Sequence, residues 1–201
     1  MIVVVGGHSR NIGKTSVVER IIEATPEKSW TAIKITQFGH DRCSANGEPC
    51  DCATTDLDHP FAMTREINPE SGTDTSRYLA AGARESIWLR TRIGDLGFAM
   101  PALREVLDHA KNTILESNSV LKFVRPDLYL VVMDTENPDF KDSSRLYLDR
   151  ADALLWTNGG TPHWPGVSGR LMRNLPVYRL GDRFGLPAEL VDVIREGKVI
   201  A

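Results

Sequence analysis

The amino-terminal segment constrains the fold of this chain more than any other. An apolar run, Ile2–Val5, leads through Gly6 and Gly7 into a polar turn, and Lys14–Glu23 then carries apolar residues at helical spacing. A buried strand, a glycine-bearing turn and an amphipathic helix in this order form the context in which backbone N–H groups converge on phosphate oxygens. We therefore predict a phosphate-binding loop at the start of the chain.

The spacing of the glycines leaves two alignments of this loop open. A standard loop places its first glycine five positions before the second. His8 occupies that position, whereas Gly7 lies six positions before Gly13. Either the loop is one residue longer or His8 fills the first glycine position, and we assign His8 no catalytic role. Nucleotide contacts are expected from Gly7, Ser9, Asn11, Gly13, Lys14, Thr15 and Ser16.

Two side chains at the predicted helix start have roles in phosphate chemistry. Lys14 is expected to reach the β and γ phosphates and to neutralise charge that develops on the γ phosphate. The hydroxyl of Thr15 is expected to be a ligand of Mg²⁺. Arg10 is either an additional cation for the phosphates, in its own chain or across a homodimer, or an ordinary surface arginine.

Strand and helix patterns alternate along the rest of the chain, which favours a mainly parallel sheet covered by helices on both faces. We predict an α/β, three-layer P-loop NTPase fold in a single domain spanning residues 1–201, interrupted by a Cys-rich insertion at about 37–73. The expected strands are Ile2–Val5, Trp30–Ile35, Ser86–Leu89, Thr113–Leu115, Leu128–Met133, Ala153–Trp156 and Val177–Leu180. The expected helices are Lys14–Glu23, Ser76–Ala83, Met100–Lys111, Ser143–Arg150 and Ala188–Glu196.

Composition excludes several kinds of partner. The net charge of −3 provides no basic field that would bind nucleic acid without sequence preference. No stretch approaches the roughly 18 consecutive apolar residues of a spanning helix, and no basic region precedes the first strand. We therefore expect a cytoplasmic protein that acts on neither nucleic acid nor membranes.

The cysteines are clustered in the predicted insertion. All three, Cys43, Cys50 and Cys52, lie between His40 and His59. Thiolates and imidazoles are the ligands of structural zinc sites, and four of these five residues would close a tetrahedral site. An iron–sulfur centre and an exposed loop with reduced cysteines are the alternatives.

Three further segments resemble the molybdopterin-guanine dinucleotide biosynthesis protein B family, small GTP-binding proteins related to dethiobiotin synthetase. Ala32-Ile33-Lys34-Ile35 is similar to the second strand of that family, although Ile35 replaces a histidine. Asp74-Thr75-Ser76-Arg77 followed by Ala81-Gly82-Ala83 resembles its Asp-Ser helix. Leu115-Glu116-Ser117-Asn118 stands where the family has Val-Glu-Gly. The resemblance extends from Ile2 to about Asp134.

The resemblance implies that Glu116 completes the Mg²⁺ site. A carboxylate leaving the apolar run Ile114-Leu115 is also costly to bury without a cation or a donor. Asp134 is the competing second acid, and Asp41 could contribute through water. Asn158 is the candidate for recognising a purine base, with a simple Asn-Gly turn as the alternative. A preference for guanine follows from the resemblance alone.

The functional expectation is a Mg²⁺-dependent protein that binds GTP or ATP, with slow hydrolysis in which Lys14 and Glu116 are the catalytic residues. The resemblance implies an adaptor role in the biosynthesis of molybdenum cofactor or another metal cofactor, with an enzyme of that biosynthesis as partner. Two alternatives remain open. One is an ATP-dependent small-molecule kinase or ligase of the dethiobiotin synthetase type, and the other is a non-catalytic metal-binding adaptor.

Overall fold

The computed structural model describes residues 1–38, 60–160 and 164–197 of the chain. Within these residues a sheet of eight strands has the order β3-β4-β2-β5-β1-β6-β7-β8. All neighbouring strands are parallel except β3 and β4, which pair antiparallel at one edge. The strands are β1 (Ile2–Gly7), β2 (Thr31–Phe38), β3 (Phe61–Glu66), β4 (Glu85–Arg92), β5 (Thr113–Glu116), β6 (Leu128–Met133), β7 (Ala153–Trp156) and β8 (Val177–Arg179).

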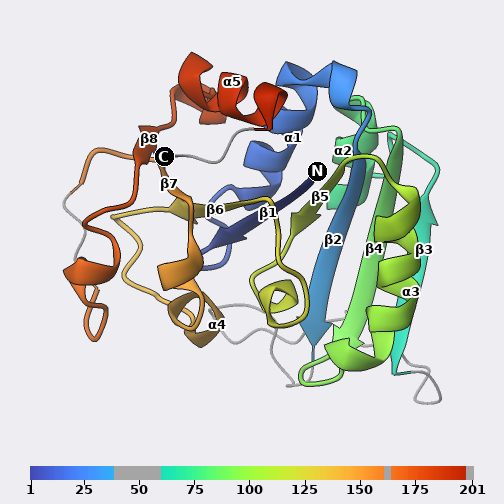
Figure 1. Cartoon of the computed structure of the whole chain (residues 1–201), viewed down its shortest axis with the longest axis horizontal. Helices are drawn as coiled ribbons and strands as arrows, with labels where there is room; N and C mark the ends of the chain where they lie inside the picture. Colours follow the sequence, from blue (N-terminus) through green and yellow to red (C-terminus); the bar gives the residue numbers. More distant parts are fainter. Residues whose placement is uncertain (39–59, 161–163, 198–201) are drawn as a thin grey trace.

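The sheet is the middle of three layers (Figure 1), which confirms the predicted α/β class. One face is covered by α1 (Lys14–Ala24), α2 (Asp74–Ala80) and α5 (Ala188–Glu196). The other face is covered by α3 (Leu96–His109), the short helix η2 (Ser119–Lys122) and the segment that holds α4 (Asp142–Arg145) and η3 (Leu148–Arg150).

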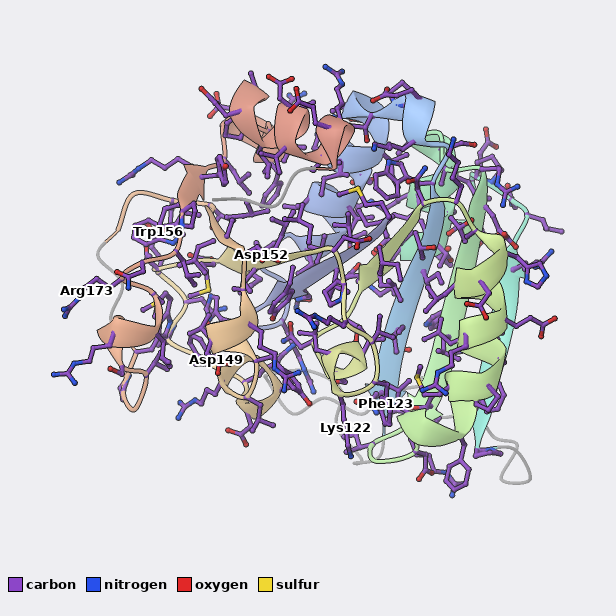
Figure 2. The ribbon with its side chains drawn as sticks, in the orientation of Figure 1. Lys122, Phe123, Asp149, Asp152, Trp156 and Arg173 are labelled. Atoms are coloured by element: carbon purple, nitrogen blue, oxygen red, sulfur yellow. The ribbon has the colours of Figure 1, made fainter. Side chains whose placement is uncertain are left out.

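Strand β1 shows why the apolar run at the amino terminus is continuous. Val3 and Val5 pack into the core under α1, whereas Val4 packs into the core on the opposite face. A strand buried on both faces needs apolar side chains in both directions. Figure 2 shows side chains crowding both sides of the sheet, with Trp156 at the carboxyl end of β7.

Several elements differ from the sequence prediction. The single helix expected at Ser143–Arg150 is wrong: Tyr147 has a φ of −126° and separates α4 from η3. Strand β3 was not predicted and lies inside the segment 37–73, where it forms the antiparallel edge of the sheet. Helix α2 is shifted from the expected Ser76–Ala83. It begins at Asp74, where the Thr73 hydroxyl accepts the Ser76 N–H and caps the helix start, and it ends at Ala80.

The parallel strands place their following loops at one edge of the sheet. The carboxyl ends of β1, β5, β6 and β7 lie side by side in the pairing register, and the arrowheads of β2 and β4 point to the lower edge in Figure 1. This is the edge where open parallel sheets bind ligands. No helix in the described part of the chain combines the length and the apolar character needed to cross a membrane.

Candidate phosphate-binding and metal site

The turn between β1 and α1 has the backbone of an anion-binding loop. Gly13 precedes α1 with a φ of +90°, in the left-handed region that favours glycine. Within the described residues, no side chain caps the start of α1, and no acidic residue lies in its first turn. The uncapped N–H groups and the positive end of the helix dipole therefore remain available for an anion.

The close approach of Lys14 to Gly7 favours the longer of the two loop alignments, in which Gly7 is the first loop glycine. A Cβ at Gly7 would lie 2.9 Å from Lys14 Cδ and 2.8 Å from Ile12 Cδ1. The stem of Lys14 thus crosses directly over Gly7, and its ammonium donates to the Ser9 carbonyl at 2.8 Å. Burial lowers the pKa of Lys14, which indicates a cation held in a partly desolvated site.

His8 points away from the phosphate side and is a structural residue. Its ring is fully buried, with centroids 4.9 Å from the ring of Trp164 and 5.3 Å from that of Phe140. Nδ1 lies 2.7 Å from the Asp139 carbonyl, and Nε2 accepts the N–H of Asp134 at 3.0 Å. These partners require a neutral ring protonated on Nδ1, and burial lowers the pKa of His8 accordingly.

The remaining loop residues predicted to touch nucleotide are held by other parts of the protein. The Ser9 hydroxyl donates to Asp139 at 2.6 Å, and the Ser16 hydroxyl accepts from Arg77 at 3.0 Å. Asn11 is exposed and has a φ of +54°, which an asparagine tolerates better than most residues. Their backbone N–H groups lie in the loop, and contacts of these residues with a nucleotide stay a prediction.

Glu116 and Thr15 are brought together as predicted for two ligands of one metal ion. Glu116 ends β5, its Cα is the register partner of Val5 in β1, and it is only 6% exposed. The Thr15 hydroxyl donates to its carboxylate at 2.8 Å. The adjacency of β1 and β5 therefore places a buried carboxylate beside the start of α1.

Three residues complete this cluster, and the sequence analysis gave none of them a role. The Lys34 ammonium lies 3.2 Å from both carboxylate oxygens of Glu116 and also pairs with Asp74. The buried Tyr78 hydroxyl donates to Glu116 as well, and burial followed by the charge of Glu116 raises the pKa of Tyr78 well above its ordinary value. For Lys34, the sequence contained one indication of such a role, because a lysine within the otherwise apolar run Ala32-Ile33-Lys34-Ile35 needs a charged partner.

Asp134, the competing acid, is used elsewhere. One of its carboxylate oxygens accepts the Glu136 N–H at 3.0 Å and the Asn158 amide at 2.5 Å. Asn158 also accepts the Thr135 N–H at 3.1 Å. Its side chain thus ties the ends of β6 and β7 together, and recognition of a purine by this amide stays a prediction.

Asn118 is a further residue that the sequence analysis quoted without a role. Its side-chain oxygen accepts the Gly7 N–H and its amide donates to the Gly7 carbonyl, both at 2.9 Å. A Cβ at Gly6 would lie 2.1 Å from the Asn118 oxygen and 2.8 Å from the Tyr129 hydroxyl. Both glycines before the loop are therefore required by close neighbours, and Asn118 fixes the entry of the chain into the loop.

The cysteine cluster and Asp41 lie outside the described residues. The proposed metal ligands His40, Cys43, Cys50, Cys52 and His59 all fall in the segment 39–59, so the predicted zinc site stays a prediction. Within the described part of the chain no group of three or more His, Cys, Asp or Glu side chains is placed to hold a metal ion.

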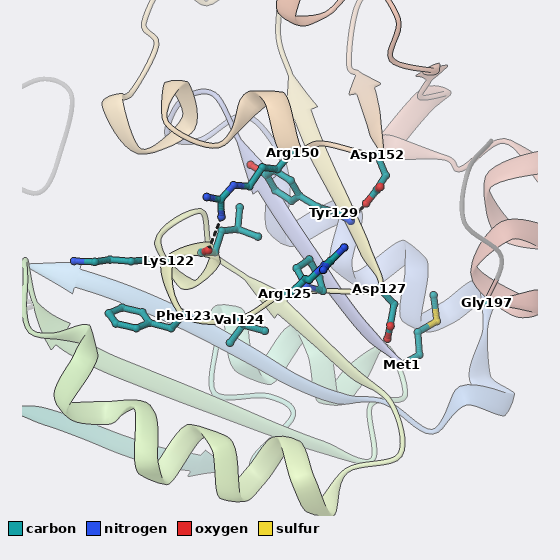
Figure 3. A pocket seen from close by; sticks show the side chains of 12 residues that line it. Met1, Lys122, Phe123, Val124, Arg125, Asp127, Tyr129, Arg150, Asp152 and Gly197 are labelled. Carbon is teal, nitrogen blue, oxygen red and sulfur yellow. Dashed lines mark hydrogen bonds between the residues drawn. The ribbon is translucent and has the colours of Figure 1, made fainter.

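A large hollow of about 1010 Å³ lies at the opposite edge of the sheet (Figure 3). Met1, Asp127 and Asp152 line it, and these residues directly precede β1, β6 and β7. Parallel strands carry their ligand-binding loops at the carboxyl ends, so this hollow is separate from the phosphate loop.

The order of elements and the geometry of the loop define the class of the fold. A glycine loop with Lys14 and Thr15 follows the central strand, and an acidic residue ends the adjacent strand. This combination is the pattern of a phosphate-binding loop in an α/β fold with a mainly parallel sheet.

Comparisons with known proteins add a distant structural similarity. No protein-family model and no curated protein matches the chain. Among solved structures, the ATP complex of LpxK from Aquifex aeolicus is similar with a TM-score of 0.47 and 16% sequence identity. The alignment covers 94% of this chain and 59% of that one, so this chain spans less than two thirds of the length of the LpxK chain. At this level of similarity, the fold class rests on the strand order and the loop geometry.

Proposed function

We propose that the protein is a Mg²⁺-dependent nucleoside triphosphatase, which binds GTP or ATP at the β1–α1 loop. The observation that carries the proposal is an uncapped helix start, bearing Lys14, whose next residue Thr15 donates to the buried carboxylate of Glu116 at the end of the adjacent strand. The first feature suits a polyphosphate, and the second suits its metal ion.

The cluster around Glu116 fits a divalent cation. A threonine hydroxyl and a carboxylate supply the hard oxygen ligands that Mg²⁺ prefers. These oxygens already bind one cation: the Lys34 ammonium lies 3.2 Å from the Glu116 carboxylate and 3.3 Å from the Thr15 hydroxyl. Mg²⁺, when bound with nucleotide, would supply positive charge that offsets the charge developing on the phosphates.

The residues of the chain perform the remaining tasks. The loop backbone and the start of α1 bind and orient the phosphates, and Lys14 exchanges its bond to the Ser9 carbonyl for a phosphate oxygen. Asn118 and the buried His8 hold the two ends of the loop in place through their bonds to Gly7 and to the β6–α4 connection. A preformed loop lowers the cost in conformational entropy of binding a nucleotide.

The proposed biological role is slow hydrolysis coupled to the biosynthesis of a metal cofactor, in partnership with an enzyme of that biosynthesis. Its support is the resemblance of the segments around Lys34, Asp74 and Glu116 to the molybdopterin-guanine dinucleotide biosynthesis protein B family. The structure adds that these segments, distant in sequence, meet through the side chains of those three residues.

A small-molecule kinase or ligase is the second candidate, and Lys34 favours it. This ammonium is 16% exposed and sits beside the metal ligands, where it could hold the anionic group of an acceptor. The acceptor pocket would draw on the segment 37–73, most of which lies outside the described residues. A non-catalytic metal-binding adaptor is the third candidate, and it depends on the cysteine cluster.

The test compares turnover of GTP and of ATP as Mg²⁺ is titrated, for the parent protein and for Thr15→Val. Valine keeps the shape of threonine but removes the hydroxyl ligand, so we expect the Mg²⁺ requirement of turnover to shift at least tenfold. Thr113→Val is the matched control, because the Thr113 hydroxyl is buried without a hydrogen-bond partner at the start of β5, away from the loop. Equal Mg²⁺ dependence in all three proteins would refute the metal assignment. Phosphate transfer only when an acceptor is added would favour the kinase.

A further inference from the structure

The connection between β6 and α4 is hydrogen-bonded to His8 and Ser9 near both of its ends. The Lys141 N–H donates to the His8 carbonyl at 2.8 Å, and the Ser9 hydroxyl donates to Asp139 at 2.6 Å. At the other end, the Asp134 N–H donates to His8 Nε2. These bonds hold the backbone of Lys141 beside the loop, although Lys141 lies far from the loop in the sequence.

An aromatic cluster packs against the segment that carries Lys141. The rings of His8, Phe140 and Trp164 contact one another with centroid separations of 4.9 to 5.4 Å, and Phe140 immediately precedes Lys141. Phe140 and Trp164 are 6% and 3% exposed. The buried ring of Phe140 restricts the backbone at Lys141, so the Cα of the lysine has a defined position beside the loop.

The charges around Lys141 leave its ammonium uncompensated. In the part of the chain that the structure describes, this ammonium makes no hydrogen bond or ion pair, and the nearby Asp139 carboxylate accepts from Ser9. Burial, and then the positive charges of Lys14 and Arg10, lower the pKa of Lys141 to about 7, against weaker opposing effects of Asp139 and Glu116. The neutral ring of His8 adds no charge to this group.

A half-buried lysine beside two other cations is unfavourable unless an anion binds there. We propose that Lys141 is a second phosphate-binding lysine, whose ammonium binds a phosphate-type oxyanion beside the β1–α1 loop. The proposal rests on the proposed function, since it assigns this residue to the same site. The oxyanion is either the terminal phosphate of the nucleotide or the anionic group of a second substrate.

The first experiment measures binding by calorimetry with a non-hydrolysable triphosphate analogue and with the corresponding diphosphate. We expect Lys141→Met to weaken the triphosphate analogue about 10- to 100-fold, as for loss of one charge-assisted hydrogen bond, and the diphosphate less than about threefold. Lys141→Arg keeps the charge and should retain most of the affinity. Lys111→Met changes an exposed lysine at the opposite edge of the sheet and should have no effect.

A second arm identifies the source of the oxyanion. Inorganic phosphate is titrated into protein saturated with the triphosphate analogue. If the parent binds phosphate in that complex, and Lys141→Met loses this binding while triphosphate affinity is unchanged, Lys141 serves the second substrate. If only triphosphate affinity falls, Lys141 serves the terminal phosphate.

Proton uptake supplies a readout that a merely structural role would not change. At pH 8 the nucleotide-free protein holds Lys141 largely neutral, and an anion favours its charged form. The parent should therefore take up a proton on binding, measured by calorimetry in buffers of different ionisation enthalpy, and Lys141→Met should take up less. Unchanged triphosphate and phosphate binding together with unchanged proton uptake would overturn the proposal. Retained diphosphate binding in that case would leave the β1–α1 nucleotide site standing, whereas loss of all binding in the parent would refute the site itself.

Discussion

Replacing Glu116 by glutamine tests both the proposed metal site and the contribution of this carboxylate to the stability of the fold. Glu116 is 6% exposed and accepts from Thr15, Lys34 and Tyr78. Glutamine keeps the length and shape of the side chain but has one oxygen instead of two, and its amide group is a donor. At least one of the three donors around it then loses its acceptor and faces another donor.

The magnitude follows from the burial of this cluster. A hydrogen bond to a charged group contributes about 1.5 to 3 kcal/mol, and solvent does not screen a carboxylate this deeply buried. For a domain of this size, 1 kcal/mol shifts the melting temperature by about 2 to 4 °C. We therefore expect Glu116→Gln to melt roughly 3 to 12 °C below the parent in the absence of nucleotide.

The assay combines thermal unfolding with calorimetry of a triphosphate analogue at several Mg²⁺ concentrations. In the parent, Mg²⁺ should increase the affinity for the analogue, and Glu116→Gln should lose most of this increase because an amide is a poorer ligand of a hard cation. Glu105→Gln, an exposed glutamate of α3, is the matched control. Unchanged melting together with unchanged Mg²⁺ dependence would show that Glu116 neither stabilises the cluster nor binds the metal.

Three further predictions concern the loop and the segment beyond it. Burial lowers the pKa of His8, so below about pH 6.5 the unfolded chain binds a proton that the folded chain does not, and the free energy of unfolding should fall as the pH drops. A His8→Asn variant should lack this part of the pH dependence when both proteins are followed by urea unfolding. Gly13→Ala should destabilise the protein more than Gly94→Ala. Both glycines have a positive φ, +90° and +97°, but only a Cβ at Gly13 would clash with a neighbour, the ring of Phe184 at 2.1 Å. Equal losses of unfolding free energy would contradict this reasoning. Protein purified under reducing conditions with zinc supplied should contain about one equivalent of zinc, Cys50→Ser should contain less, and metal-free protein in both cases would exclude the predicted zinc site.

The sequence predicted the layers of the fold for clear physical reasons, and it proposed Thr15 and Glu116, which the structure places in contact. Strands buried on both faces appear as continuous apolar runs, as in Ile2–Val5 and Leu128–Met133. The glycines and the Lys14-Thr15 pair indicated the phosphate loop locally, without knowledge of the tertiary structure. Glu116 could be chosen because a carboxylate at the end of a buried strand needs a partner.

The residues that were missed act through contacts that spacing does not reveal. Strand β3 is a short edge strand, and its residues are partly exposed and only weakly apolar. The antiparallel pairing with β4 that stabilises it is a tertiary contact. Lys34 and Lys141 lie far from Lys14 in sequence, and only the register of the sheet and the bonds around His8 bring them near the loop.

Asn158 illustrates the converse case. It follows β7 at the edge of the sheet where ligands are expected, and at the same position its side chain binds Asp134 and Thr135. A residue type that suits base recognition also suits the joining of two strand ends, and only the structure shows which partners the amide has.

Binding of a Mg²⁺–triphosphate analogue to the parent and to Lys14→Ala, measured by calorimetry, tests the central claim most directly. The parent should bind one equivalent, and Lys14→Ala should bind about 10- to 100-fold more weakly or not measurably, while its melting temperature stays close to that of the parent. Lys111→Ala should bind as the parent does. An affinity that is the same in the parent and in Lys14→Ala, or no binding by a correctly folded parent, would contradict the assignment of the β1–α1 loop as a nucleotide site.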